Sequence, residues 1–197
     1  MSSPGRPQTR VAILDAARTL FEEQGYFGAG LEAVAKKAGV SRQAIYLHFA
    51  SKADLLTALH ARIYETDVVP ALDRHPVWTA PTALEALDAM IAVDAEVASK
   101  VWRLHEALVV ARRHHEEVDA SLRPREDERY QEYVRLARWM KGEGELPGRM
   151  RVTTFADILW GLLGLGTFQN LVIERGWSLE RFTAWVRATV RAQLQPA

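Results

Sequence analysis

The side chains of this chain that are best suited to bind a partner are gathered in one short stretch, from Val40 to Ala53. No aspartate or glutamate occurs in it, whereas an ordinary solvated surface mixes acids with bases. Ile45 and Phe49 lie one helical turn apart and are its strong inward anchors, which leaves Arg42, Gln43, Tyr46 and His48 facing outwards. The candidates for contact with a partner are Ser41, Arg42, Gln43, Ala44, Tyr46, His48 and Lys52.

These residue types match the chemistry of double-stranded DNA. The guanidinium of Arg42 suits the O6 and N7 acceptors of guanine, and the amide of Gln43 can pair with N6 and N7 of adenine. Tyr46, His48 and Lys52 suit phosphate oxygens, which fix the register of a protein on DNA without carrying sequence information. The alternative is a helical bundle whose outer face is merely solvated, and the absence of acids disfavours it.

The preceding segment predicts the helix and the turn that present this surface. Apolar residues recur at i, i+3, i+4 and i+7 from Leu31 to Ala38, which places one apolar stripe on a short helix. Gly39 stands where a left-handed residue ends a helix at least cost, and Ser41 is a good N-cap for a second helix, about Arg42 to His48. This arrangement is a helix-turn-helix, whose second helix enters the major groove.

Two further helices are expected to support this motif. The first runs from about Thr9 to Gln24 and is ended by a glycine, and the fourth is opened by Ser51 and Asp54, which resemble a capping box. Residues 1–8 are polar and rich in proline and glycine. They are interpreted as an arm that could reach the minor groove, or else as a disordered tail.

At these residues the chain resembles the tetracycline-repressor (TetR) family of bacterial transcriptional regulators. The resemblance covers about the first 65 residues and rests on spacing as well as on residue type. The residues that carry it are Leu20-Phe21, Gly25-Tyr26, Val34-Ala35, Ala38-Gly39-Val40-Ser41, Ile45-Tyr46-Leu47-His48-Phe49, Ser51-Lys52 and Leu55-Leu56.

The resemblance implies an all-α fold, in which an N-terminal three-helix DNA-binding domain precedes a C-terminal helical domain for effector binding and dimerisation. It also implies a homodimer that represses, or less often activates, a promoter. Such a dimer leaves its pseudo-palindromic operator when a small molecule binds. One position departs from the family pattern: Gly30 stands where the family usually has a threonine that caps the second helix and touches a phosphate, and glycine offers no hydroxyl.

Composition and charge agree with this interpretation. The 197 residues are 48% hydrophobic, carry zero formal net charge and include no cysteine, which excludes disulfides and thiolate metal sites. The first 64 residues hold 8 Lys or Arg and 5 Asp or Glu, and the rest hold 17 and 20, which places the phosphate-binding end at the N-terminus. No signal peptide is visible. The apolar run from Ile158 to Ile173 is shorter than the roughly 18–20 residues of a spanning helix, so a cytoplasmic protein without a membrane segment is expected.

The second part of the chain is expected to be helical throughout. Three prolines between residues 70 and 81 mark a connection, so we expect a DNA-binding domain at 1–66 and an effector-binding and dimerisation domain at 67–197. The predicted helices are residues 82–100, 101–117, a segment that begins at Pro124, residues 154–174 opened by a capping box from Thr154 to Asp157, and residues 178–194.

The helix predicted at 154–174 is apolar nearly all round, so it must be covered on all sides. The remaining helices of one chain are too few for that, and Gly161, Gly164 and Gly166 would let another backbone approach closely. Together with the last helix and their copies, it predicts a four-helix dimer interface, the alternative being packing within one chain. The candidate interface residues are Phe155, Leu159, Leu162, Phe168, Phe182, Trp185 and Val186.

Six tryptophans, five of them in or beside the predicted C-terminal helices, favour an aromatic pocket between helices for a small hydrophobic or aromatic effector. His105 is its polar candidate, or alternatively a satisfied core histidine or a metal ligand. The candidate pocket residues are Met90, Trp102, His105, Tyr130 and Trp139.

Signals of catalysis are weak, and no catalytic residue, metal or cofactor is expected. The chain has no glycine-rich phosphate loop and no nucleophile elbow, and the run from His114 to Glu117 lacks the i, i+4 histidine spacing of a helical metal site. Two alternatives to a DNA-binding regulator remain. One is a sensor or carrier of the same fold with a weakened DNA role, which Gly30 favours, and the other is a helical enzyme.

Overall fold

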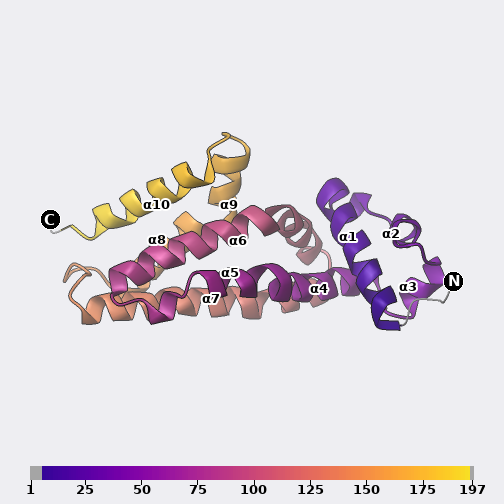
Figure 1. Cartoon of the computed structure of the whole chain (residues 1–197), viewed down its shortest axis with the longest axis horizontal. Coiled ribbons are helices and arrows are strands. Elements are labelled where there is room, and N and C mark those ends of the chain that lie inside the picture. Colours follow the sequence, from indigo (N-terminus) through magenta and orange to yellow (C-terminus); the bar gives the residue numbers. More distant parts are fainter. Residues whose placement is uncertain (1–5, 196–197) are drawn as a thin grey trace. The chain divides into compact units, whose positions relative to one another are not determined.

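A computed structural model describes residues 6–195 of the chain, which are helical apart from turns and short connections and contain no strand (Figure 1). The predicted all-α fold is confirmed. Contacts group these residues into two units. Unit 1 holds the described residues up to Thr66 together with Arg103–Arg123, and unit 2 holds Asp67–Trp102 and the residues from Pro124 onwards. The domain division at residue 66 stays a prediction.

Unit 1 is built on four N-terminal helices and on the adjoining ends of two longer ones. The four are α1 (Arg6–Gly28), α2 (Leu31–Ala38), α3 (Arg42–Tyr46) and α4 (Lys52–Ile63). Helix α1 packs against α2 and α4, and α2 packs against α3. Their shared apolar side chains are buried: Ile13, Leu14, Ala17, Leu20, Phe21, Val34, Ile45, Phe49, Leu55, Leu56, Leu59 and Ile63.

The first helix differs from its expected limits at both ends. It begins at Arg6, inside the segment interpreted as an arm, while residues 1–5 of that arm lie outside the described residues. Gly25 interrupts the helical dihedral angles as expected, with φ 68° and ψ 179°, but a further turn follows it, from Tyr26 to Gly28. Only glycine enters this region of φ at low cost, so the break is fixed by sequence.

The turns around α3 follow the predicted chemistry. Gly39 is left-handed (φ 69°, ψ 30°) at the end of α2, and the Ser41 hydroxyl accepts a hydrogen bond from the Ala44 amide at 3.1 Å. At the start of α4, Ser51 Oγ accepts from the Asp54 amide at 2.9 Å, and Asp54 Oδ2 accepts from the amide of Ala50 at 2.8 Å. This is the reciprocal bonding of a capping box, except that the carboxylate accepts from the amide of the residue before the N-cap instead of from the N-cap amide. Helix α3 ends at Tyr46, two residues earlier than predicted.

The rest of the chain forms unit 2 and the two long helices, α6 and α7, that the two units share. Their elements are a π-helix η1 (Tyr64–Val68), α5 (Val69–Arg74), a 3₁₀ turn η2 (Val77–Thr79), α6 (Ala83–Arg112), α7 (Glu116–Gly142), α8 (Val152–Leu163), α9 (Leu165–Phe168), a π-helix η3 (Gln169–Ile173) and α10 (Leu179–Gln193). Within unit 2, α10 packs against α8 and η3. The predicted helices at 82–100 and 101–117 are wrong as separate elements, because α6 runs through both segments.

Two predicted helix starts are also wrong. Pro124 lies inside α7 instead of opening a new helix. An interior proline removes one backbone hydrogen bond at a cost of roughly 3 kcal/mol, and burial of Val118 and Leu122 before it and Tyr133 after it outweighs that cost. The capping box predicted at Thr154 does not form either. Helix α8 begins at Val152 with no side-chain cap, and the carboxylate of Asp157 accepts a hydrogen bond from the Tyr130 hydroxyl at 2.8 Å instead.

The apolar helix predicted at 154–174 is broken at Gly164, whose ψ of 144° lies far from helical values, so α8, α9 and η3 follow one another as separate elements. The apolar segment is also longer than the run expected from sequence. It spans the 22 residues from Val152 to Ile173 and is, by length and composition alone, apolar enough to cross a membrane. Only 22% of its most apolar window is fully buried within the chain, and Val152, Leu162, Leu165, Leu171 and Val172 are partly covered by the core of unit 2.

Helix α2 starts without the hydroxyl cap that the family pattern supplies. Gly30 is its N-cap with φ −84° and ψ 146°, no side chain bonds the first turn, and a Cβ built on Gly30 meets no atom within 4 Å. We predict that Gly30→Ser raises the free energy of unfolding by about 0.5–1 kcal/mol, because it adds a cap hydroxyl and reduces the freedom of the unfolded chain. Urea unfolding at equilibrium measures the difference. An unchanged or lower midpoint would show that the backbone amides at this helix end already have hydrogen-bond partners.

Candidate nucleic-acid interface

Helix α3 turns its polar side chains outwards because its apolar ones are buried. Ile45 is fully buried and Phe49 is 2% exposed, so the helix is fixed by one side to the core of unit 1. On the other side Ser41, Arg42 and Gln43 are exposed, and Ala44 is half-buried. Tyr46 is 48% exposed. The outward direction predicted for these residues is therefore the one the structure has.

Two aromatic contacts restrain the exposed cations of this surface. Arg42 donates a hydrogen bond to the Tyr46 hydroxyl at 3.3 Å, and its guanidinium lies 5.8 Å from the centre of the Tyr46 ring. This hydrogen bond raises the pKa of the Arg42 guanidinium above its already high value. From α1, Arg10 lies over the ring of Phe49 at 5.2 Å. An arginine held over a ring keeps donors free for a partner.

Lys52 is the first residue of α4, where the helix dipole is positive and favours an anion. Its ammonium lies 4.6 Å from the centre of the Tyr26 ring. The Lys52 side chain is half-buried, and burial lowers the pKa of its amino group from the usual value. His48 is also half-buried, with its ring tilted against Phe49 at 6.2 Å.

One exposed residue of this surface was missed from the sequence. Leu47 caps the end of α3 and is 67% exposed, more than any other large apolar side chain among the described residues. The helical spacing alone could have found it, because Leu47 is two positions from Ile45 and Phe49 and cannot share their buried side. An apolar side chain there can contact a thymine methyl group.

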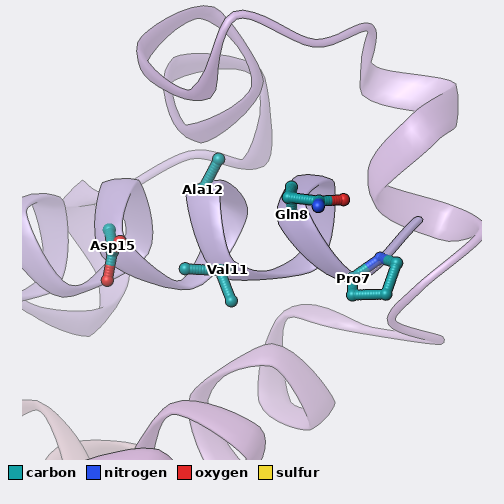
Figure 2. A pocket seen from close by; sticks show the side chains of 5 residues that line it. All are labelled: Pro7, Gln8, Val11, Ala12 and Asp15. Atoms are coloured by element: carbon teal, nitrogen blue, oxygen red, sulfur yellow. The ribbon is translucent and has the colours of Figure 1, made fainter. Parts of the chain in front are cut away.

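A shallow hollow of about 350 Å³ lies elsewhere in unit 1, along one side of α1. Figure 2 shows its five lining side chains on successive turns of that helix: Pro7, Gln8, Val11, Ala12 and Asp15. Its one carboxylate, on Asp15, is paired with Arg62 of α4 at 3.1 Å. A hollow lined by a single helix cannot enclose a small molecule, so this one carries no argument for an effector site.

The residues predicted to line an effector pocket have different surroundings. Met90 is 6% exposed and belongs to the core of unit 2, and Trp102 of the same unit is half-buried. Tyr130 bonds Asp157, and the indole N–H of Trp139 donates to Glu143 at 2.7 Å. His105 belongs to unit 1 by its contacts. These contacts do not test the predicted pocket, so the role of the five residues in effector binding stays a prediction.

Sequence reasoning missed a polar cluster within the helices of unit 2. Tyr133 donates to Asp94 at 2.8 Å, and Arg129 donates to Asp94 at 3.1 Å and to the carbonyl of Leu163 at 2.7 Å. That carbonyl directly precedes the helix break, so Arg129 bonds an acceptor that the break leaves free. Burial raises the pKa of the Tyr133 hydroxyl, which therefore stays protonated. Trp160 covers the guanidinium at 5.6 Å.

Five of the seven residues predicted for the dimer interface are buried within a single chain: Phe155, Leu159, Phe168, Phe182 and Val186. Leu162 and Trp185 are only half-buried. The five cannot reach a second chain without leaving the core of unit 2. In the apolar segment from Val152 to Ile173, the large apolar side chains that remain exposed are Trp160, 37% exposed, and Ile173, 39% exposed.

Among the described residues no cluster of three or more histidine, aspartate or glutamate side chains could hold a metal ion. His114 and His115, adjacent in the sequence, instead contact aromatic side chains of α1. The His114 ring meets Phe27 at 5.3 Å, and His115 Nε2 lies 2.8 Å from the Tyr26 hydroxyl.

Comparison with known proteins agrees with this geometry. The family model for bacterial regulatory proteins of the tetR family matches residues 13–59, which include the whole helix-turn-helix. The transcriptional regulator SrpR of Pseudomonas putida is 31% identical over 163 residues, which cover 79% of this chain and 72% of SrpR.

Solved structures share the fold at low identity. A structure from Pseudomonas aeruginosa PAO1 has a TM-score of 0.80 with 20% identity, over 97% of this chain and 92% of that one. A structure from Saccharomonospora viridis in complex with choline has a TM-score of 0.78 with 21% identity, over 93% and 96% of the two chains. With the exposed surface of α3 and the match to SrpR, these findings show that the chain belongs to the TetR family of DNA-binding transcriptional regulators.

Proposed function

We propose that two copies of this chain form a repressor dimer that binds a pseudo-palindromic operator through α3 and leaves it when a small molecule binds. The observation that carries the DNA contact is the acid-free, exposed side of α3, fixed by the burial of Ile45 and Phe49. Regulation is the shared function of the family, and the chain's relatives are regulators rather than enzymes. A bacterial operator places this activity in the cytoplasm.

The residues of the interface divide into base contacts and phosphate contacts. Arg42 and Gln43 are the first two residues of α3, and in a helix-turn-helix the N-terminal residues of the second helix reach the base edges. Ser41, Tyr46, His48 and Lys52 flank them and suit the DNA backbone, with the small Ala44 allowing close approach. Arg42 would exchange its hydrogen bond with Tyr46 for two bonds to a guanine.

Dimerisation is supported by the apolar surface that stays exposed between Val152 and Ile173. Trp160 and Ile173 are more than a third exposed, and Gly161 is exposed with nothing within 4 Å of a Cβ built on it. A second copy about a two-fold axis would cover this segment with the same segment of its own. Leu162 and Trp185, both half-buried, lie at the edge of the proposed contact, while the five buried candidates support it from beneath.

The effector is proposed to bind among the helices of unit 2, where Trp102, Tyr130 and Trp139 supply aromatic surface. The cluster of Asp94, Arg129 and Tyr133 supplies the polar groups that an otherwise apolar pocket needs for orientation. A solved structure of the same fold holds choline, which supports a small molecule as the ligand class. A hydrophobic or aromatic molecule that binds there must change tryptophan fluorescence, and a ligand that leaves the fluorescence unchanged contradicts this placement.

A second candidate function rests on Gly30. Because this glycine carries no hydroxyl, one family contact with phosphate is missing, which favours a sensor or carrier with a weakened DNA role. The complete surface from Ser41 to Lys52 favours DNA binding instead. The two candidates differ in whether a salt-sensitive, sequence-specific complex with DNA forms.

The roles of Arg42 and Lys52 in DNA binding can be separated. On a duplex selected from a randomised pool, Arg42→Ala is expected to cost roughly 1–3 kcal/mol and to relax preference at one position of each half-site. Lys52→Ala is expected to weaken all sequences alike and to make the salt dependence shallower by about one unit per half-site. Titrations on matched and mismatched duplexes at several salt concentrations measure both.

Arg138→Ala is the matched control for these variants, because it removes an exposed arginine from unit 2. It should leave operator affinity unchanged. The assignment of roles is wrong if Arg42→Ala keeps full discrimination between duplexes while Lys52→Ala loses it.

The proposed dimer predicts a specific effect of Gly161→Glu. Glutamate has a higher helix propensity than glycine, and a Cβ built on Gly161 meets no atom within 4 Å, so the chain should fold as well as the wild type. The added charge should nevertheless separate the copies, because it blocks close approach of the second backbone. Sedimentation at micromolar concentration is expected to show a wild-type dimer and a variant monomer.

Val110→Glu is the control for the introduced charge, since Val110 is 39% exposed in unit 1. It should remain a dimer. A folded wild-type monomer at micromolar concentration, or a Gly161→Glu variant that stays dimeric, would place the interface elsewhere.

A further inference from the structure

Tyr26 lies between the buried helices that support the binding surface of unit 1 and that surface itself. It directly follows Gly25, whose positive φ interrupts α1, and it is only 4% exposed. One side of its ring stacks on Phe21 at 6.0 Å with 24° between the planes. The ring also carries a hydroxyl that must find a partner, because an unpaired buried hydroxyl destabilises the fold. Tyr26 is therefore fixed by apolar packing and oriented by one polar contact.

His115 supplies that polar contact. Its Nε2 lies 2.8 Å from the Tyr26 hydroxyl, and the two rings meet edge to face at 5.3 Å. The other ring nitrogen, Nδ1, lies 3.8 Å from the carboxylate of Glu117. From these two contacts we assign the ring proton to Nδ1, facing the carboxylate, which leaves Nε2 to accept from Tyr26. Burial, aided by the charge of Glu117, raises the pKa of the Tyr26 hydroxyl, so the hydroxyl keeps the proton that it donates.

The ring that His115 orients is the ring that Lys52 contacts. The Lys52 ammonium lies 4.6 Å from the ring centre, within the range of a cation–π contact. A lysine side chain in solution samples many rotamers, and immobilising it at a binding surface costs affinity. An ammonium already held over a ring at the N-terminus of α4 loses less of this freedom when a phosphate arrives.

We propose that His115, through Tyr26, positions Lys52 for its contact with a DNA phosphate. The inference rests on the phosphate contact proposed above for Lys52 and adds two residues to the binding apparatus that do not touch DNA themselves. His115 fixes the ring through the hydroxyl, the ring fixes the ammonium, and the ammonium meets the phosphate. The three residues come from α1, from α4 and from the turn before α7, and all belong to unit 1.

The test is a mutant cycle on Lys52 and His115, with binding to a duplex selected from a randomised pool as the readout. His115→Leu removes the acceptor of the Tyr26 hydroxyl. It is expected to weaken binding roughly two- to fivefold, which is the size of one cation–π contact. In the Lys52→Ala background the same change is expected to have no further effect, because the ammonium that it positions is gone.

Two matched variants separate positioning from a loss of structure. His114→Leu changes the neighbouring histidine, which contacts Phe27 and not the Tyr26 hydroxyl, and should bind like the wild type. His115→Gln keeps a side-chain hydrogen-bonding group and should recover part of the affinity. Should His115→Leu not fold, Tyr26→Phe takes its place in the cycle, since it removes only the hydroxyl.

Proton NMR of the free protein gives a readout that needs no DNA. The Lys52 ammonium lies over the Tyr26 ring, so the resonances of the methylene protons next to it should be shifted upfield in the wild type. His115→Leu should move them towards the positions of a free lysine, and His114→Leu should not. Unchanged Lys52 resonances in His115→Leu would overturn the inference.

The outcomes of the cycle are distinct. Equal weakening by His115→Leu in the wild-type and the Lys52→Ala backgrounds would overturn the inference and leave the proposed function standing. A wild type that selects no duplex, or a Lys52→Ala variant that binds like the wild type, would overturn the phosphate contact and the inference with it.

Discussion

Burial of Ile45 and Phe49 is the constraint on which the DNA-binding surface depends. Helix α3 has five residues, and a helix so short is unstable in water without tertiary contacts. Burying an isoleucine or phenylalanine side chain contributes roughly 1.5–3 kcal/mol, so these two anchors hold the helix and also decide its rotation about its axis. The outward residues from Ser41 to His48 take their direction from them. A polar side chain at Ile45 would therefore disturb the whole surface.

Unit 2 depends on a different constraint, the break at Gly164. There the chain leaves the helical conformation, the Leu163 carbonyl loses its helical partner and Arg129 supplies a replacement at 2.7 Å. Asp94 in turn balances the charge of the half-buried guanidinium, and the Tyr133 hydroxyl accepts a further hydrogen bond from Arg129. The polar cluster thus supplies the hydrogen bond that the backbone loses at the interruption of an otherwise apolar segment. The same segment keeps apolar surface open, which is why a second copy is its proposed cover.

Local signals predicted unit 1 well. The left-handed Gly39, the Ser41 and Ser51 caps and the inward Ile45 each follow from nearby residues, and the structure confirms them. In the second half, packing outweighs local signals. Pro124 does not end a helix. Five of the dimer candidates are buried for a similar reason. The sequence shows that the helices of Phe155 and Phe182 have an apolar side, but it cannot show which apolar side faces another chain. The Tyr26–His115 contact joins residues 89 positions apart, beyond the reach of any local pattern.

The central claim is that two copies of α3 enter successive major grooves of one operator. Footprinting with a chemical that methylates N7 of guanine in the major groove tests this most directly, on a duplex selected by the wild-type protein. The account predicts two protected patches on one side of the duplex, with centres about 10 base pairs or a multiple of this apart. A single protected patch, no protection of guanine N7, or protection spread evenly along the duplex would contradict it.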